Sequence, residues 1–217
     1  MNNVKLIIIF ILSIIVCQYS YASKQHNNTN DKLALAVQTD LHTAIINPIN
    51  TEINFNKQKQ QQLWVDEMSK RLQKWIPNEI IRKRILMITQ YEAARSGLDP
   101  QLVLSVITVE SKFNKYAISK TGALGFMQVM PFWVKEIGAR DHNLLDAQTN
   151  IRYGCTILKH YMELEHGNLY YALGRYNGSR GKNTYPNLVL NAYNKYWQPA
   201  RSATITDNIS YQRYASR

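Results

Sequence analysis

Apolar positions recur with a helical period over most of the chain. The first pattern begins near residue 58, where apolar side chains follow at steps of three and four residues: Trp64, Met68, Leu72 and Trp75. Further helices are expected at about residues 78–96, 99–110, 146–164, 169–176 and 185–197. An irregular, glycine-punctuated stretch precedes Pro131, which is expected to open a short helix. The pattern predicts a mainly helical fold with a small irregular lobe.

The apolar stretch LDPQLVLSVITVES combines features of a strand and of a helix. Its β-branched residues suit a strand, but Asp99 is a good N-cap and Pro100 fits a first helical turn. The cap and the length favour a buried helix that ends near Glu110. A carboxylate is costly to bury unpaired, and the C-terminal end of a helix gives it no help. Glu110 therefore needs a partner or a chemical role.

The N-terminus has the pattern of a secretory signal. Lys5 precedes an apolar run at 6–16, and small residues lie at the −3 and −1 positions of a cleavage site after Ala22. Retention as a membrane anchor is the alternative. Cys17 also allows a lipoprotein. Val16 disfavours this interpretation, because it is bulky at the position before the cysteine, where lipoprotein signals have alanine or glycine.

The remaining segments differ in composition. The sequence divides into a signal peptide, a disordered or linker segment rich in Asn, Gln, Lys and Thr, a helical extension, one catalytic domain and a polar tail, at 1–22, 23–57, 58–78, 79–197 and 198–217. Removing the signal leaves Cys155, which cannot form an internal disulfide and falls on a helical apolar pattern. We expect it to be a small buried hydrophobe rather than a nucleophile.

The charge of the chain narrows the choice of partners. The formal net charge is +11, which suits an anionic partner such as nucleic acid, a membrane surface or a cell-wall polymer. No glycine-rich phosphate loop, nucleic-acid motif or zinc-like Cys/His spacing accompanies the charge. We therefore expect no nucleic-acid partner, no metal and no organic cofactor.

Five motifs occur in an order typical of one enzyme family. They are ESKFN, TGALGFMQVMP, NIRYG, LGRYNGS and TYPNLVLNAYNKYW, at 110–114, 121–131, 150–154, 173–179 and 184–197. Together they resemble the catalytic domain of soluble, lysozyme-like lytic transglycosylases, glycoside hydrolase family 23, over about residues 79–197. Phe126 and Arg175 depart from the family's usual Leu and Ala, and both could alter the shape of a sugar subsite.

The resemblance implies a lysozyme-like fold and a catalytic role for Glu110. An apolar wall raises a glutamate's pKa, which keeps the proton that a departing glycosidic oxygen needs. In the family, the same glutamate then acts as a base on the muramyl 6-hydroxyl, with help from the substrate's N-acetyl group, and gives a 1,6-anhydro end. No Asp or Glu lies between Glu110 and Glu136, so a second acid for hydrolysis could come only from Asp141 or Asp146.

The resemblance also implies a set of substrate-binding residues: Ser111, Ser119, Gln128, Met130, Tyr176, Asn177 and Tyr185. Three of these have structural alternatives. The Ser111 hydroxyl could bind backbone instead of sugar, Asn177 could be a turn residue, and Tyr185 could simply pack in the core.

These inferences predict an exported peptidoglycan lytic transglycosylase of the periplasm or cell envelope. Its partners would be glycan strands, and a secretion or conjugation apparatus is a further candidate; we expect a monomer. The alternatives are a muramidase of the goose-type lysozyme kind and a non-catalytic wall-binding assembly factor.

Overall fold

A computed structural model describes residues 38, 41–42 and 55–198. The expected signal peptide and nearly all of the linker and tail lie outside these residues. The elements are α3 (Phe55–Leu72), α4 (Glu79–Arg95), α5 (Pro100–Glu110), α6 (Phe132–Ile137), α7 (Ala147–Leu164), α8 (Leu169–Tyr176), α9 (Thr184–Ala192) and the π-helical turn η1 (Tyr193–Trp197). The mainly helical fold is confirmed. Within the described part of the chain, no helix is long and apolar enough to span a membrane.

Local signals set the ends of the central helices. Asn78 caps α4 by accepting a hydrogen bond from the Ile81 amide, and α4 ends in a Schellman motif in which Gly97 has a φ of 65°. Asp99 caps α5 by accepting from the Gln101 amide, at 2.8 Å. The stretch that suited both a strand and a helix is therefore the helix that its cap indicated.

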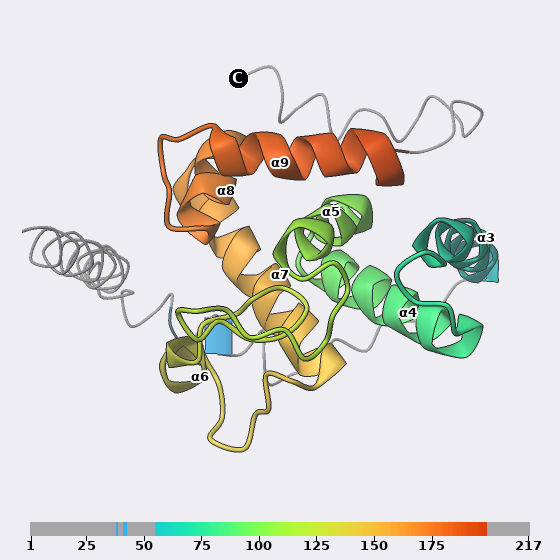
Figure 1. The fold of residues 1–217 in the computed structure, drawn as a ribbon, viewed down its shortest axis with the longest axis horizontal. Coiled ribbons are helices and arrows are strands. Elements are labelled where there is room, and N and C mark those ends of the chain that lie inside the picture. The colour runs from blue at the N-terminus through green and yellow to red at the C-terminus, as the bar shows by residue number, and fades with distance from the viewer. Residues whose placement is uncertain (1–37, 39–40, 43–54, 199–217) are drawn as a thin grey trace, which may run out of the picture. The chain divides into compact units, whose positions relative to one another are not determined.

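Helix α5 forms the centre of the core. Residues 101–108 are all buried, and α5 packs against α4, α9 and η1 (Figure 1). The hydroxyls of Ser105 and Thr108 donate to the carbonyls of Gln101 and Leu104, four residues earlier, so the polar side chains in this buried helix are satisfied. Glu110 is the last residue of α5, where the core meets the irregular lobe.

The lobe at 111–131 is nearly without regular structure. It folds back on itself through isolated antiparallel bridges from Leu124 to Ile118 and to Val129. Figure 1 shows this segment as looped coil between α5 and α6. The expectation of a small irregular lobe is confirmed.

A buried charge network joins α4 to α7. The Glu92 carboxylate is fully buried and accepts from the Nε atoms of Arg95, at 3.0 Å, and Arg152, at 3.1 Å. These charge-assisted bonds offset the cost of burying the carboxylate. Cys155, also on α7, is fully buried, and burial raises the pKa of its thiol well above the usual value. It is the buried small residue that the sequence predicted.

Candidate active site

The Glu110 carboxyl lies at the junction of the helical core and the lobe. Its Oε1 atom accepts a hydrogen bond of 2.5 Å from the Tyr185 hydroxyl. Burial raises the pKa of Glu110 to about 7, while the hydrogen bond from Tyr185 works in the opposite direction. Near neutral pH, a substantial fraction of Glu110 therefore holds a proton that it can transfer.

Two tyrosines from consecutive helices accompany Glu110. Tyr185, in the first turn of α9, has a buried ring, so it both packs in the core and reaches the carboxyl. Tyr176, at the end of α8, donates from its hydroxyl to the Met127 carbonyl at 2.8 Å. Burial, and then the nearby Glu110, raise the pKa of both phenols well above the usual value. Both hydroxyls therefore stay protonated as donors.

Ser111 binds backbone, which is one of its two expected alternatives. Its hydroxyl lies 2.8 Å from the Phe126 carbonyl and 3.3 Å from the Ile107 carbonyl, both of which can accept from it. Through the shorter bond, Ser111 ties the end of α5 to the lobe. It therefore fixes the position of Glu110 relative to the Gly125–Met127 segment.

Gln128 is partly committed to the lobe. Its backbone has a φ of 50°, and its Nε2 atom donates to the carbonyls of Ala117, at 3.1 Å, and Gly125, at 2.9 Å. The Oε1 atom is the part of the amide that remains to accept a bond from a sugar. The lobe is thus shaped by a side chain that was expected to contact substrate.

The other expected binding residues are half-buried around the same lobe and loop. The Ser119 hydroxyl accepts from the amides of Thr121 and Ala123, which closes a turn. Met130 precedes α6. Asn177 follows α8, and its Oδ1 atom accepts from the Ser179 hydroxyl at 3.0 Å, as a turn residue would. The structure gives Ser119 and Asn177 local partners in the protein.

Asn150 is a functional candidate that the sequence analysis did not single out. It is 1% exposed, and its side chain accepts from the Met127 amide and donates to the carbonyls of Leu124 and Leu144, each at 2.8 Å. The contacts with Met127 and Leu124 fix the lobe onto α7, and the contact with Leu144 ties the α6–α7 segment to the same helix. Asn150 opens the NIRYG motif, but nothing in the motif indicates which distant amides it would meet.

Two glycines let the lobe lie directly against α7. A Cβ atom at Gly154 would lie 2.3 Å from the Met127 sulfur, and one at Gly125 would lie 2.4 Å from the Asn150 Nδ2 atom. Gly125 also has a φ of 72°. The GFMQ and NIRYG segments therefore pack directly against each other. This contact positions the Met127 carbonyl, which accepts from the Tyr176 hydroxyl.

Arg175 joins an ion-pair cluster beside the α8–α9 loop. Its guanidinium pairs with Glu165, which also accepts from the Nε atom of Arg180 at 2.6 Å and from the Nη2 atom of Arg180 at 2.9 Å. Glu165 is the buried member of the cluster and lies at the end of α7. Arg175 therefore tethers the loop that follows Tyr176. Phe126, the other residue that departs from the family's usual motif, is buried in the core.

The model of the transglycosylase SLT domain family matches residues 87–196, about half of the chain. The chain belongs to this family. The lysozyme-like fold class that the motifs implied is confirmed with it, and the matched span contains Glu110, Asn150 and Tyr185.

Several relatives of this SLT-domain chain carry transglycosylase names. The transglycosylase of Enterobacteria phage PRD1 is 32% identical over 47% of this chain and 40% of its own length. Membrane-bound lytic murein transglycosylases C of Haemophilus influenzae (strain PittEE) and Actinobacillus pleuropneumoniae serotype 5b (strain L20) are 35% and 42% identical, over 37% and 24% of this chain. The matches cover 25% and 14% of those two proteins.

A solved structure gives a partial match. The lytic transglycosylase Slt of Pseudomonas aeruginosa, an inactive mutant, is 29% identical over 44% of this chain and 17% of that chain, with a TM-score of 0.41.

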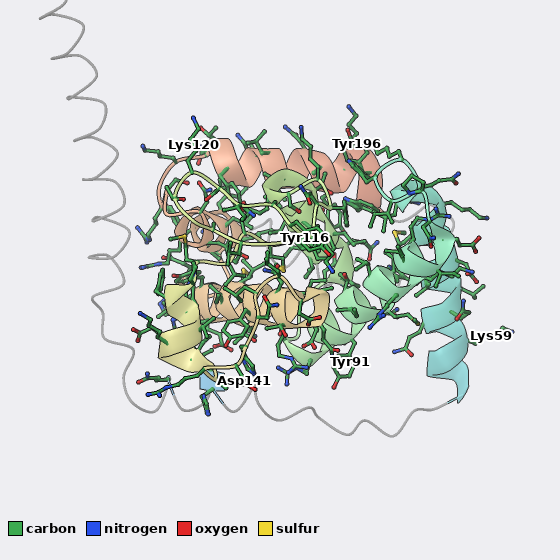
Figure 2. The ribbon with its side chains drawn as sticks, turned by 60° about the horizontal axis from the view of Figure 1, so that its bottom comes forward. Lys59, Tyr91, Tyr116, Lys120, Asp141 and Tyr196 are labelled. Atoms are coloured by element: carbon green, nitrogen blue, oxygen red, sulfur yellow. The ribbon has the colours of Figure 1, made fainter. Side chains whose placement is uncertain are left out.

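The two acids that could serve a hydrolase, Asp146 and Asp141, have different surroundings in this SLT-domain chain. The Asp146 carboxylate caps α7 by accepting from the Thr149 amide at 2.9 Å. Burial raises its pKa, but the hydrogen bonds together outweigh burial and lower the pKa below the usual value. Asp141 is exposed beside α6, apart from Tyr116 of the lobe (Figure 2). Among residues 38, 41–42 and 55–198, no cluster of three or more His, Cys, Asp or Glu side chains could hold a metal ion.

Proposed function

We propose that this SLT-domain chain is a peptidoglycan lytic transglycosylase that cleaves the β-1,4 bond between N-acetylmuramic acid and N-acetylglucosamine. The observation that carries the proposal is the Glu110 carboxyl, whose pKa burial raises to about 7 and which accepts a bond from Tyr185. A carboxyl with that pKa suits general acid catalysis near neutral pH. Family membership supports peptidoglycan as the substrate.

The reaction needs one protein carboxyl acting twice. Glu110 first donates its proton to the glycosidic oxygen, and the bond from muramyl C1 to that oxygen breaks. The substrate's N-acetyl oxygen supports the positive charge that develops at C1. The Glu110 carboxylate then removes the proton from the muramyl 6-hydroxyl, whose oxygen bonds to C1. The enzyme ends as it began, the product is a 1,6-anhydro ring, and no water is consumed.

The surrounding residues would hold the two reacting groups in place. Tyr185 orients the carboxyl, and Tyr176, held on the Met127 carbonyl, presents its ring beside it. The free lone pairs of Gln128 Oε1 can accept from a sugar amide or hydroxyl. Met130 would provide an apolar edge. Because the 6-hydroxyl is part of the bound sugar, its attack is effectively intramolecular and outcompetes water.

Ser119 and Asn177 are the remaining residues that we assign to the substrate site. Both have half-buried side chains that already bond to their own turns. We infer that they shape this site through their turns, while Ser111 fixes the end of α5 through the Phe126 carbonyl.

Mass spectrometry of products from purified peptidoglycan tests the reaction. Products ending in 1,6-anhydro-muramyl residues are lighter by one water than hydrolysis products, and the Glu110→Gln variant should release neither. Mainly reducing muramyl ends would contradict the proposal and identify a hydrolase. Asp141 and Asp146 would then be the next residues to substitute.

The activity requires a location that contains peptidoglycan. We propose export to the periplasm or cell envelope through the N-terminal signal, on the basis of Lys5, the apolar run at 6–16 and Ala22. N-terminal sequencing of exported protein should find a chain starting near Ser23. A lipid-modified start at Cys17, or an intact Met1, would contradict cleavage there.

A further inference from the structure

Trp75 connects the N-terminal helical extension to the catalytic helix. It lies in the turn between α3 and α4, outside the residues matched by the family model. Its ring centroid is 5.3 Å from that of Phe113 and 5.5 Å from that of Trp197, and it meets Tyr196 edge-on at 5.1 Å. We call Trp75, Phe113, Tyr196 and Trp197 the aromatic cluster; Tyr196 is labelled in Figure 2.

The aromatic cluster holds the turn that leads away from Glu110. Lys112 and Phe113 have φ values of 51° and 63°, a conformation that side chains with a Cβ atom disfavour. Phe113 is only 5% exposed, because Trp75 and Trp197 both cover its ring. Packing of these rings therefore opposes relaxation of a strained turn that begins two residues after Glu110.

The same cluster also holds the body of α5. The Trp197 indole donates from Nε1 to the Thr108 hydroxyl at 2.9 Å, and the Trp197 carbonyl accepts from Gln101 Nε2 at 3.2 Å. Thr108 and Gln101 lie on one side of α5, two turns apart. Trp197 thus fixes the helix along its length, and the Trp75 ring stacks on the Trp197 ring.

The turn that carries Trp75 is itself firmly built. Arg82 is buried and donates to the carbonyls of Ile76, at 3.0 Å, and Pro77, at 2.5 Å, while its Nε atom donates to the Ser69 hydroxyl at 3.1 Å. Arg71 donates to the Gln198 carbonyl at 2.6 Å, which ties α3 to the end of η1. Trp75 is therefore a fixed support and not a mobile surface ring.

We propose that Trp75 is a positioning residue for Glu110, and that the α3–α4 turn is a functional part of the catalytic domain. Trp75 stabilises the Lys112–Phe113 turn, which sets the direction in which the Glu110 carboxyl meets Tyr185. The inference that this affects turnover rests on the proposed function. The effect of Trp75 on the Glu110 carboxyl does not rest on the proposed function, because the burial of the carboxyl and its contact with Tyr185 can be measured without substrate.

The test compares Trp75→Ala and Trp75→Phe with Trp64→Ala. Trp64 is a half-buried tryptophan of α3 outside the aromatic cluster, so its removal controls for loosening of the extension. We expect Trp75→Ala to lower the Glu110 pKa by about one unit or more, because water reaches the carboxyl, as measured by carbon-13 NMR. On soluble glycan chains, kcat should fall by about tenfold or more with KM within about twofold, since misplacement slows the chemical step. Trp75→Phe should keep most of the raised Glu110 pKa and most of kcat.

Each outcome decides the proposal. A folded Trp75→Ala variant with unchanged Glu110 pKa and kcat would overturn it, as would equal changes in Trp64→Ala. If Trp75→Ala does not fold, Trp75→Leu keeps apolar bulk without the stacked ring and replaces it. If that variant is also unfolded, Trp75 is a folding residue and the proposal fails. A fourth outcome separates the two proposals. If Trp75→Ala shifts the Glu110 pKa but the Glu110→Gln variant stays active, Trp75 still positions Glu110, and the proposed function is refuted.

Discussion

The Tyr185 hydroxyl donates to the Oε1 atom of Glu110 at 2.5 Å, although 75 positions separate the two residues along the chain. Two opposing effects meet at this contact. The hydrogen bond favours the charged carboxylate, and burial favours the neutral acid. Burial is the larger effect, because the pKa of Glu110 is about 7 and not the ordinary 4.5. The contact therefore orients the acid without removing its proton near neutral pH.

Glu110→Gln should abolish turnover while the fold is kept. Glutamine has a similar size but no transferable proton, so activity on purified peptidoglycan should fall by at least ~10²-fold, the usual scale of general acid catalysis. Asp141→Asn is the matched control, since Asp141 is exposed, and it should stay near wild-type activity. Near-normal turnover by a folded Glu110→Gln protein would remove Glu110 from the mechanism.

Tyr185→Phe should shift the pH dependence of the rate upward. The Tyr185 hydrogen bond lowers the Glu110 pKa, so its loss raises that pKa further, and the alkaline limb of the pH–rate profile moves to higher pH. The maximal rate should fall by about tenfold, because the acid loses its orienting partner. Tyr170→Phe, whose hydroxyl meets Asn187 at an exposed site, should change neither. An unchanged alkaline limb would show that the contact has no electrostatic role.

Stability should depend on pH through Glu110. The folded pKa is raised from 4.5 to about 7, so the unfolded chain loses its proton first as pH rises. The stabilisation from the protonated group is complete below the unfolded value and is lost as pH rises through about 7. The advantage of Glu110→Gln in free energy of unfolding should therefore grow between about pH 4 and pH 8, by at most roughly 3 kcal/mol. Urea unfolding at both pH values measures it, and a constant difference would contradict the raised pKa.

Asn150→Ala should loosen the lobe. It leaves the Met127 amide and the Leu144 carbonyl without their partner in a buried site, and the Leu124 carbonyl keeps only the Val129 amide as a donor. We expect a loss of at least about 2 kcal/mol in the free energy of unfolding, and reduced activity because the Met127 carbonyl no longer holds Tyr176 in place. Asn187→Ala removes an exposed asparagine of α9 and should cost less than about 0.5 kcal/mol. Equal effects of the two substitutions would count against the anchoring role.

The helices were predictable from local signals. Asp99 and Pro100 start α5, Gly97 ends α4 in the left-handed conformation, and Asp146 caps α7, each where the chain carries the residue type that the position requires. The last predicted helix has an α-helical part, α9, and a π-helical turn, η1. That turn was not predictable, because its shape depends on the tertiary contacts of Trp197 with Thr108 and Gln101.

The hydrogen-bond partners of the site residues were harder to predict from the sequence. The position of Glu110 after an apolar run predicted a raised pKa, which the structure has. By contrast, Gln128 and Asn150 donate to carbonyls of the lobe, and a backbone carbonyl has no sequence signature. Glu165 meets Arg175 and Arg180 only because α7, α8 and the α8–α9 loop fold together. The assignment of substrate contacts stays a prediction.

The packing of α3 matters for anyone who shortens the protein. The sequence motifs suggest a minimal fragment of residues 79–197, which removes Val65, Met68 and Leu72, three buried side chains of α3. Their partners on α4, which packs against α3, would then face water, as would the outer faces of Phe113 and Trp197 that Trp75 covers. Such a fragment would carry a newly exposed aromatic patch next to α5 and would tend to self-associate. Recombinant work should retain the chain from α3 onward.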